Sequence, residues 1–327
     1  MLARITRLKL NNVEVGTTPM LIPSISSMLS RPDKLLETVR EIINGPILIS
    51  AYDYYYKLGK TPKILNFTDL IFLDSGGYEC TKDRDDMGLA THNAKPKRWT
   101  RDMHKKVIRE WSPEIPTVVV SYDHPNVRNS IEKQLNDAAS IFEPDDHRFL
   151  KEILIKPELR KDKMVRIENL ELCAESLKKF DILGITDKEL GISINQRMRN
   201  IVKVRETLDK VGISIPIHIF GSMDTTTTPL YFLAGADIFD GLAWLRFVFE
   251  GGNTMYIPSS GTKSFGIAEN VKNIWIRSVY QNYNYMQDLK LQMEKYVRTS
   301  DFNSFKYNAE FFKQSYEYLE SLEGGQV

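Results

Sequence analysis

The sequence predicts an α/β protein whose core is a (β/α)8 TIM barrel, preceded by a β-hairpin and followed by helices. Three observations predict it: eight short apolar runs recur between residues 20 and 241, amphipathic stretches separate them, and most runs lack polar alternation. Strands buried on both faces of a parallel sheet have this unbroken apolar character. Eight repeats fit a closed barrel better than an open doubly wound sheet, but periodicity leaves that alternative open.

The expected elements alternate along the chain. The strands are Met20–Ile25, Pro46–Ala51, Leu70–Asp74, Thr117–Tyr122, Ile153–Lys156, Asp181–Ile185, Pro216–Phe220 and Asp237–Gly241. The helices between them are Pro32–Ile43, Lys97–Trp111, Arg128–Phe142, Ile167–Lys179, Asn195–Lys210 and Thr227–Ala234.

Two further segments frame this core. Arg7–Val15 alternates around Asn11-Asn12, a pair that tolerates positive φ, and therefore predicts a hairpin. Ile267–Arg298 and Phe302–Leu322 predict two long helices rich in Tyr, Phe and Leu. The expected domains are residues 1–266 for the hairpin and barrel, and residues 267–327 for helices packed on the barrel.

The composition excludes several classes of protein. The 327 residues are 42% hydrophobic and 27% charged, as in globular chains, and a net charge of +1 shows no basic excess that would indicate nucleic-acid binding. Two cysteines, Cys80 and Cys173, exclude a disulfide framework and a zinc site of clustered thiolates. The chain lacks an apolar run of ~20 residues and a signal-peptide pattern, so we expect a cytoplasmic protein without membrane contact.

Aspartates end three of the predicted strands, and such a barrel places its active site at those ends. Asp74 is followed by the run Ser75–Tyr78, which contains two glycines, and Asp123 and Asp240 end two other apolar runs. Each aspartate alone is equally well explained as a loop cap or turn former. Together, two carboxyl groups suit displacement at a sugar carbon, in which one attacks and another transfers a proton.

Several of these motifs resemble one family. Leu73-Asp74-Ser75-Gly76-Gly77-Tyr78-Glu79 resembles the Asp-Ser-Gly-Gly-Phe/Tyr-Gln signature of the tRNA-guanine transglycosylases. Gly235–Asp240, with Arg246 six residues later, is similar to their Gly-Ile-Asp-Met-Phe-Asp…Pro-Thr-Arg segment, and His218–Ser222 resembles the strand and glycine turn before it. The similarity runs in order from about residue 4 to 299.

The resemblance implies a (β/α)8 barrel and a role for each matching residue. Asp240 would be the nucleophile that forms a covalent glycosyl intermediate at C1′, and Asp74 the acid/base that serves the departing and incoming bases. The base would be bound by Ser75, Gly76, Gly77, Tyr78, Asp123, His124, Lys156 and Gly184. The nucleic-acid backbone would be held by Gly221, Ser222 and Arg246.

The chain departs from that family in three places. The Cys-x-Cys-x-x-Cys…His zinc site has no counterpart, since no cysteine follows Cys173 and Gln281 stands near the histidine position, so we expect no metal and no cofactor. The family's Asp-Glu-Cys reads Asp123-His124-Pro125 here. Its Gln-Gly-Gly and Gly-Gly-Leu segments read Ile155-Lys156-Pro157 and Leu183-Gly184-Ile185-Thr186.

The DpdA-type enzymes, a reduced branch that exchanges guanine in DNA for a 7-deazaguanine, are closest in pattern. We therefore expect a pentosyltransferase that inserts a preQ0-like 7-deazaguanine into nucleic acid, DNA in preference to tRNA. Two alternatives stay open: a base-excising DNA glycosylase that uses water as acceptor, and a tRNA-guanine transglycosylase. A homodimer or partner proteins are equally open.

Overall fold

Pairing between the first and last barrel strands closes the sheet. The computed structural model describes residues 2–29, 31–58, 62–80, 96–112, 114–123, 127–142 and 147–323. Around the closed barrel the strands are β10 (Ile238–Gly241), β3 (Met20–Ile25), β4 (Ile47–Ser50), β5 (Ile71–Asp74), β6 (Thr117–Val120), β7 (Leu150–Ile155), β8 (Ile182–Thr186) and β9 (Ile217–Phe220). All neighbouring pairs are parallel, and β10 pairs with both β3 and β9. The predicted TIM barrel is confirmed, and the open sheet is excluded.

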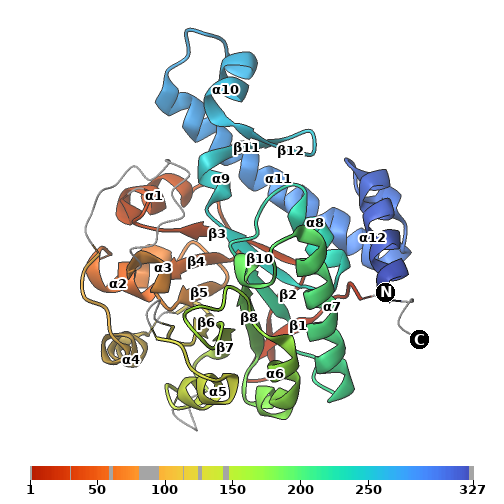
Figure 1. Cartoon of the computed structure of the whole chain (residues 1–327). Coiled ribbons are helices and arrows are strands. Elements are labelled where there is room, and N and C mark those ends of the chain that lie inside the picture. The colour runs from red at the N-terminus through yellow and green to blue at the C-terminus, as the bar shows by residue number, and fades with distance from the viewer. Residues whose placement is uncertain are drawn as a thin grey trace.

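Helices surround the barrel, as Figure 1 shows. They are α1 (Pro32–Val39), α2 (Ala51–Tyr56), η1 (Pro62–Leu65), α3 (Gly77–Cys80), α4 (Arg101–Glu110), α5 (Ile131–Ala139), α6 (Ile167–Leu172), η2 (Ala174–Lys179), η3 (Asp187–Glu189), α7 (Ile194–Lys210), α8 (Thr227–Leu233) and α9 (Ala243–Arg246). Thr100, Ser130 and Ser193 begin α4, α5 and α7 as N-caps whose hydroxyls accept backbone N–H bonds. The predicted helix Ile167–Lys179 is divided at Cys173 into α6 and η2.

Alternate residues of the barrel strands belong to two separate hydrophobic clusters. On β5, Phe72 belongs to the cluster inside the barrel, whereas Leu73 belongs to the cluster shared with the helices. On β10, Ile238 belongs to the inner cluster. Because successive side chains of a strand point to opposite faces, Asp74 and Asp240 point the same way as Phe72 and Ile238, toward the barrel interior. The alternation therefore places both acids inside the barrel at the carboxyl ends of their strands.

The predicted N-terminal hairpin is present and closes one end of the barrel. It consists of β1 (Arg7–Leu10) and β2 (Val13–Thr17), joined through Asn11 and Asn12, whose φ angles are 51° and 65°. Leu8 is buried in the interior cluster, and Leu10 and Val15 pack against that cluster. The hairpin thus lies at the amino ends of the strands, and the opposite end is left for the acids.

A second antiparallel pair follows the barrel and was not predicted. It consists of β11 (Phe247–Glu250) and β12 (Asn253–Tyr256), and it leads into α10 (Ile257–Phe265). Figure 1 shows these elements above the barrel, at the end of the long helix α11 (Val271–Thr299). The two long C-terminal helices are confirmed as α11 and α12 (Ala309–Glu323), with η4 (Phe302–Ser304) between them. In the described part of the chain, no helix combines the length and apolar character needed to cross a membrane.

A buried ion pair joins α7 to the start of β10. Arg205 is fully buried, and its guanidinium donates to the carbonyls of Gly235 and Ile215 and to the Asp237 carboxylate. The same carboxylate accepts the backbone N–H of Ile217 at 2.8 Å. Because these hydrogen bonds connect α7 to the chain around β9 and β10, the pair fixes the helix against the sheet where the barrel closes.

Replacing Arg205 with methionine is expected to lower the free energy of unfolding by about 3–5 kcal/mol, because Asp237 would be left buried without its partner. Chemical denaturation measures this loss. The matched control, Arg4→Met, breaks the partly exposed pair with Asp209 at 2.8 Å and should cost less than about 1 kcal/mol. Equal losses in the two variants would contradict the importance of the buried pair.

Candidate active site

Asp240 lies at the carboxyl end of β10 with a donor on each oxygen. The Ser24 hydroxyl, from β3, donates to Oδ2 at 2.6 Å, and the Gly221 N–H, just after β9, donates to Oδ1 at 2.9 Å. Gly221 has a φ of +76°, a conformation that favours glycine. Asp240 is only 6% exposed, so its carboxyl group is held by the barrel rather than by solvent.

Asp74 is the second acid at this end of the barrel. The Gly76 N–H donates to its Oδ2 at 3.2 Å. Burial, together with the charges of Asp123 and Asp240, raises the pKa of Asp74 to about 7. Near neutral pH this carboxyl group can therefore both give and take a proton. Asp74 ends β5, so it lies at the same end of the barrel as Asp240 of β10.

The loop after Asp74 folds tightly around Asp123. The Ser75 hydroxyl donates to the Asp123 carboxylate. A Cβ at Gly77 would lie 2.4 Å from Asp123 Oδ1, so only glycine fits there. Gly76 has a φ of +85°, and the Trp99 indole donates to the Ser75 carbonyl at 2.8 Å. The sequence motif thus holds Asp123 beside Asp74.

Lys156 contacts Asp123 from the other side. Its ammonium lies 3.7 Å from Asp123 Oδ2 and 3.2 Å from Glu189 Oε2, and it donates to the Thr186 hydroxyl at 2.7 Å. Sequence analysis did not identify Glu189 as a site residue. Its position just beyond the carboxyl end of β8 is a signal that could have found it.

Two residues predicted to have different roles meet at the rim. Tyr78 is 41% exposed, and its hydroxyl accepts a hydrogen bond from Arg246 Nη2 at 3.4 Å. The Nε of Arg246 is buried and has no hydrogen-bond partner in the described part of the chain. An unpartnered guanidinium N–H beside an exposed aromatic ring is suited to an anionic group that lies next to a planar one.

Gly184, Ser222 and His124 are the remaining predicted residues. Gly184 is in the barrel wall, where a Cβ would lie 2.6 Å from Phe220 Cε2 and 2.8 Å from Glu152 Oε1. Ser222 is 3% exposed, and its hydroxyl donates to the Ile219 carbonyl. His124 lies outside the described residues. The structure therefore brings together Asp240, Asp74, the Ser75–Gly77 loop, Asp123 and Lys156.

Sequence analysis did not assign His218 or Glu152 to the site. His218 Nδ1 lies 2.7 Å from Glu152 Oε1, and Nε2 lies 3.4 Å from Asp240 Oδ1. Both side chains are fully buried on β9 and β7. The available signal was an ionisable residue within an otherwise apolar strand, because burial of such a residue requires a partner.

The zinc ligands of the resembled family do not fit this chain. In the described ranges, no group of three or more His, Cys, Asp or Glu side chains is arranged to hold a metal ion. Gln281, near the position of the family's histidine, donates its amide to the Phe249 carbonyl at 3.3 Å.

Burial raises the pKa of the Cys80 thiol to about 12, which makes it a poor nucleophile.

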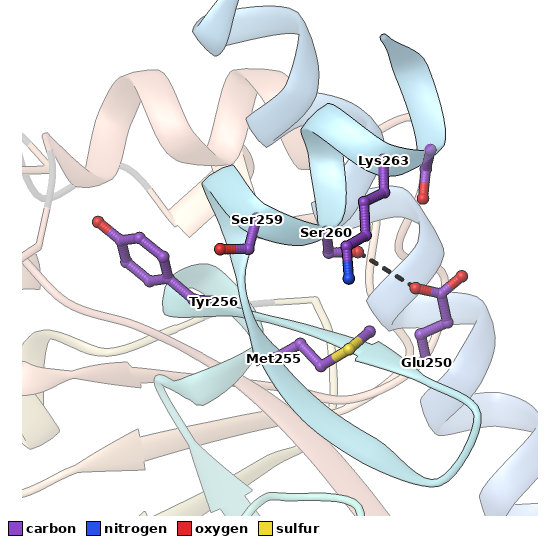
Figure 2. Close-up of a pocket in the computed structure, with 7 residues that line it drawn as sticks. Glu250, Met255, Tyr256, Ser259, Ser260 and Lys263 are labelled. Atoms are coloured by element: carbon purple, nitrogen blue, oxygen red, sulfur yellow. Dashed lines mark hydrogen bonds between the residues drawn. The ribbon is translucent and has the colours of Figure 1, made fainter. Parts of the chain in front are cut away.

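A cavity of about 510 Å³ lies beside β12 and α10, away from these acids. Figure 2 shows its lining side chains and the hydrogen bond from Ser260 to Glu250 at 3.1 Å. Its lining consists of Glu250, Met255, Tyr256, Ser259, Ser260, Lys263 and Ser264. None of these is a predicted site residue, so the cavity is separate from the candidate active site.

Comparison with known proteins gives no family. No protein-family model matches the chain, and no curated protein matches it. The chemistry of the site is therefore argued from its own residues.

The carboxyl group of Asp74 is expected to titrate near pH 7, and Asp123→Asn should lower that pKa because it removes a neighbouring negative charge. Carboxyl ¹³C shifts of aspartate-labelled protein, assigned with Asp74→Asn, measure both values. The surface variant Asp209→Asn should leave the titration unchanged. A wild-type transition near pH 4 would contradict the burial of Asp74.

Proposed function

We propose that this chain is an N-glycosyl transferase that replaces guanine in nucleic acid, DNA in preference to tRNA, by a 7-deazaguanine. The observation that carries the proposal is the pair of carboxyl groups at one barrel end. Asp240 has a donor on each oxygen, whereas the pKa of Asp74 is raised by burial to about 7. Displacement at a sugar carbon requires one carboxyl group that attacks and another that transfers a proton, and the different environments of the two acids suit these roles.

In the first step, an Asp240 oxygen attacks C1′ while the bond between C1′ and N9 of guanine breaks. The bonding electrons leave with the base, and protonated Asp74 gives its proton to that base. The products are free guanine, a glycosyl ester on Asp240 and an ionised Asp74. In the second step, Asp74 takes the proton from N9 of the incoming 7-deazaguanine, N9 attacks C1′, and Asp240 leaves as a carboxylate.

The contact between Asp123 and Lys156 supports a role for both in recognition of the base. A carboxylate accepts hydrogen bonds from the N1–H and amino groups of guanine, and an ammonium donates to its O6. Lys156 Nζ lies 3.7 Å from Asp123 Oδ2. The Ser75 hydroxyl donates to the Asp123 carboxylate, and the Lys156 ammonium donates to the Thr186 hydroxyl. Both guanine and a 7-deazaguanine present this edge, so one pocket serves the departing and the incoming base.

Arg246 and Tyr78 support binding of a polynucleotide rather than a free nucleoside. The unpartnered Nε of Arg246 suits a backbone phosphate, and the exposed Tyr78 ring suits a stacked base. A paired nucleotide would have to leave the stack to reach Asp240, at a cost of a few kcal/mol. The preference for DNA rests on the resemblance to the DpdA-type branch and on the lack of matching zinc ligands.

Asp240→Asn should reduce turnover by about 10⁴-fold or more, because the amide cannot form the glycosyl ester. The assay incubates DNA or tRNA carrying labelled guanine with the protein, with and without a 7-deazaguanine, and measures released label. Asp209→Asn is the surface control. Unimpaired turnover of Asp240→Asn would reject the nucleophile.

The same assay separates the candidate reactions. Label released from DNA only when a 7-deazaguanine is present supports exchange. Release without it, with abasic sites left in the DNA, indicates a glycosylase, and release from tRNA alone indicates a tRNA-guanine transglycosylase. No release from either nucleic acid would reject the proposal.

The rate of guanine release in a single turnover should fall about tenfold per pH unit above pH 7, because only protonated Asp74 assists the departing base. Asp123→Asn lowers the pKa of Asp74 and should move this fall to lower pH. A rate that does not change between pH 6 and 9 would remove Asp74 from the step.

A further inference from the structure

We propose that Glu152 and His218 form a buried charged chain behind Asp240, in which cationic His218 is a positioning residue that helps Asp240 leave the sugar. The inference rests on the proposed function and extends it to the second step of the reaction. It concerns the barrel interior, below the residues that touch the substrate.

The contact between Glu152 and His218 depends on a gap in the barrel wall. Glu152 is on β7 and His218 is on β9, with β8 between them. Gly184 of β8 is paired with His218, and a Cβ at this position would lie 2.8 Å from Glu152 Oε1. Because Gly184 has no side chain, the Glu152 carboxylate can reach across β8 to the imidazole at 2.7 Å.

The imidazole ring is fixed between two carboxylates. His218 is fully buried, stacks on Phe220 at a centroid distance of 3.9 Å and meets the edge of Phe72 at 5.7 Å. Nδ1 faces Glu152, and Nε2 faces Asp240 Oδ1 at 3.4 Å, a separation at which charge matters more than hydrogen bonding. The packing therefore holds one acid at each ring nitrogen.

This arrangement favours the protonated ring. In neutral imidazole one nitrogen carries a lone pair, which would face a carboxylate oxygen and be repelled. Burial opposes protonation, but the charge of Glu152 and the contacts with Asp240 outweigh it and raise the pKa of His218 to about 9. One cation thereby lies between two buried carboxylates and offsets part of their charge.

The cation acts differently in the two steps. Before attack it stabilises the Asp240 carboxylate, which does not speed the first step. Once the glycosyl ester has formed, Asp240 carries no charge, and the carboxylate is regenerated only when the incoming base displaces it. A fixed positive charge 3.4 Å from Oδ1 stabilises that departing carboxylate, so its loss should slow the second step and leave the ester to accumulate.

The test uses Glu152→Gln, which keeps the size and hydrogen bond of the side chain but removes its charge. The ¹⁵N NMR spectrum of the full chain, which has five histidines, reports the protonation of His218, assigned by its loss in His218→Asn. In the wild type we expect both ring nitrogens to be protonated at pH 7.5. Glu152→Gln should lower the pH midpoint of His218 by about one unit or more. Glu175→Gln, on the surface, is the matched control.

The second readout is the covalent adduct. With labelled DNA and a 7-deazaguanine, denaturing gels should show at least about tenfold more protein–DNA adduct for Glu152→Gln and His218→Asn than for the wild type and Glu175→Gln. A neutral His218 in the wild type, or variants with no extra adduct despite active base release, would overturn the inference. A charged His218 that depends on Glu152, found in a chain that releases no base, would instead reject the proposed function.

Discussion

The pairing of β10 with β3 is the contact on which the candidate site depends. Asp240 pairs in register with Ile22, and this places its carboxyl group within 2.6 Å of the Ser24 hydroxyl two residues further along β3. In an open sheet β10 would be an edge strand, and this donor would be absent. Barrel closure therefore builds the environment of Asp240 and also sets its relation to Asp74, two strands beyond β3.

The polar interior at this end is balanced by charge rather than by solvent. Burying an ion costs several kcal/mol unless a partner compensates it, and each acid here has such a partner or takes up a proton. Glu152 and Asp240 share His218, Asp123 has Lys156, and Asp74 has a pKa raised by burial to about 7. Neighbouring carboxyl groups therefore differ in whether a cationic partner or a raised pKa offsets their burial.

The sequence was informative where the signal is local. The eight barrel strands were predicted to within a few residues because each is an apolar run, and the acids at their ends were predicted because position along a strand is a local property. β11, β12 and α10 were missed because Asn253–Tyr256 is short, polar and mostly exposed, as loops are. The packing of Gly184 against Glu152 was not predicted, because it depends on strand register, which sequence does not show.

The hairpin that covers the amino ends of the strands has a consequence for the order in which bases would leave and enter the site. Leu8 is buried in the interior cluster, so the hairpin covers the amino ends of the strands and leaves the acids at the opposite end. In the proposed exchange the outgoing purine and its replacement would both pass through that end. The first must then vacate it before the second can arrive, and the sugar must wait on the protein in the interval. The proposed glycosyl ester on Asp240 would hold the nucleotide in the barrel during that interval.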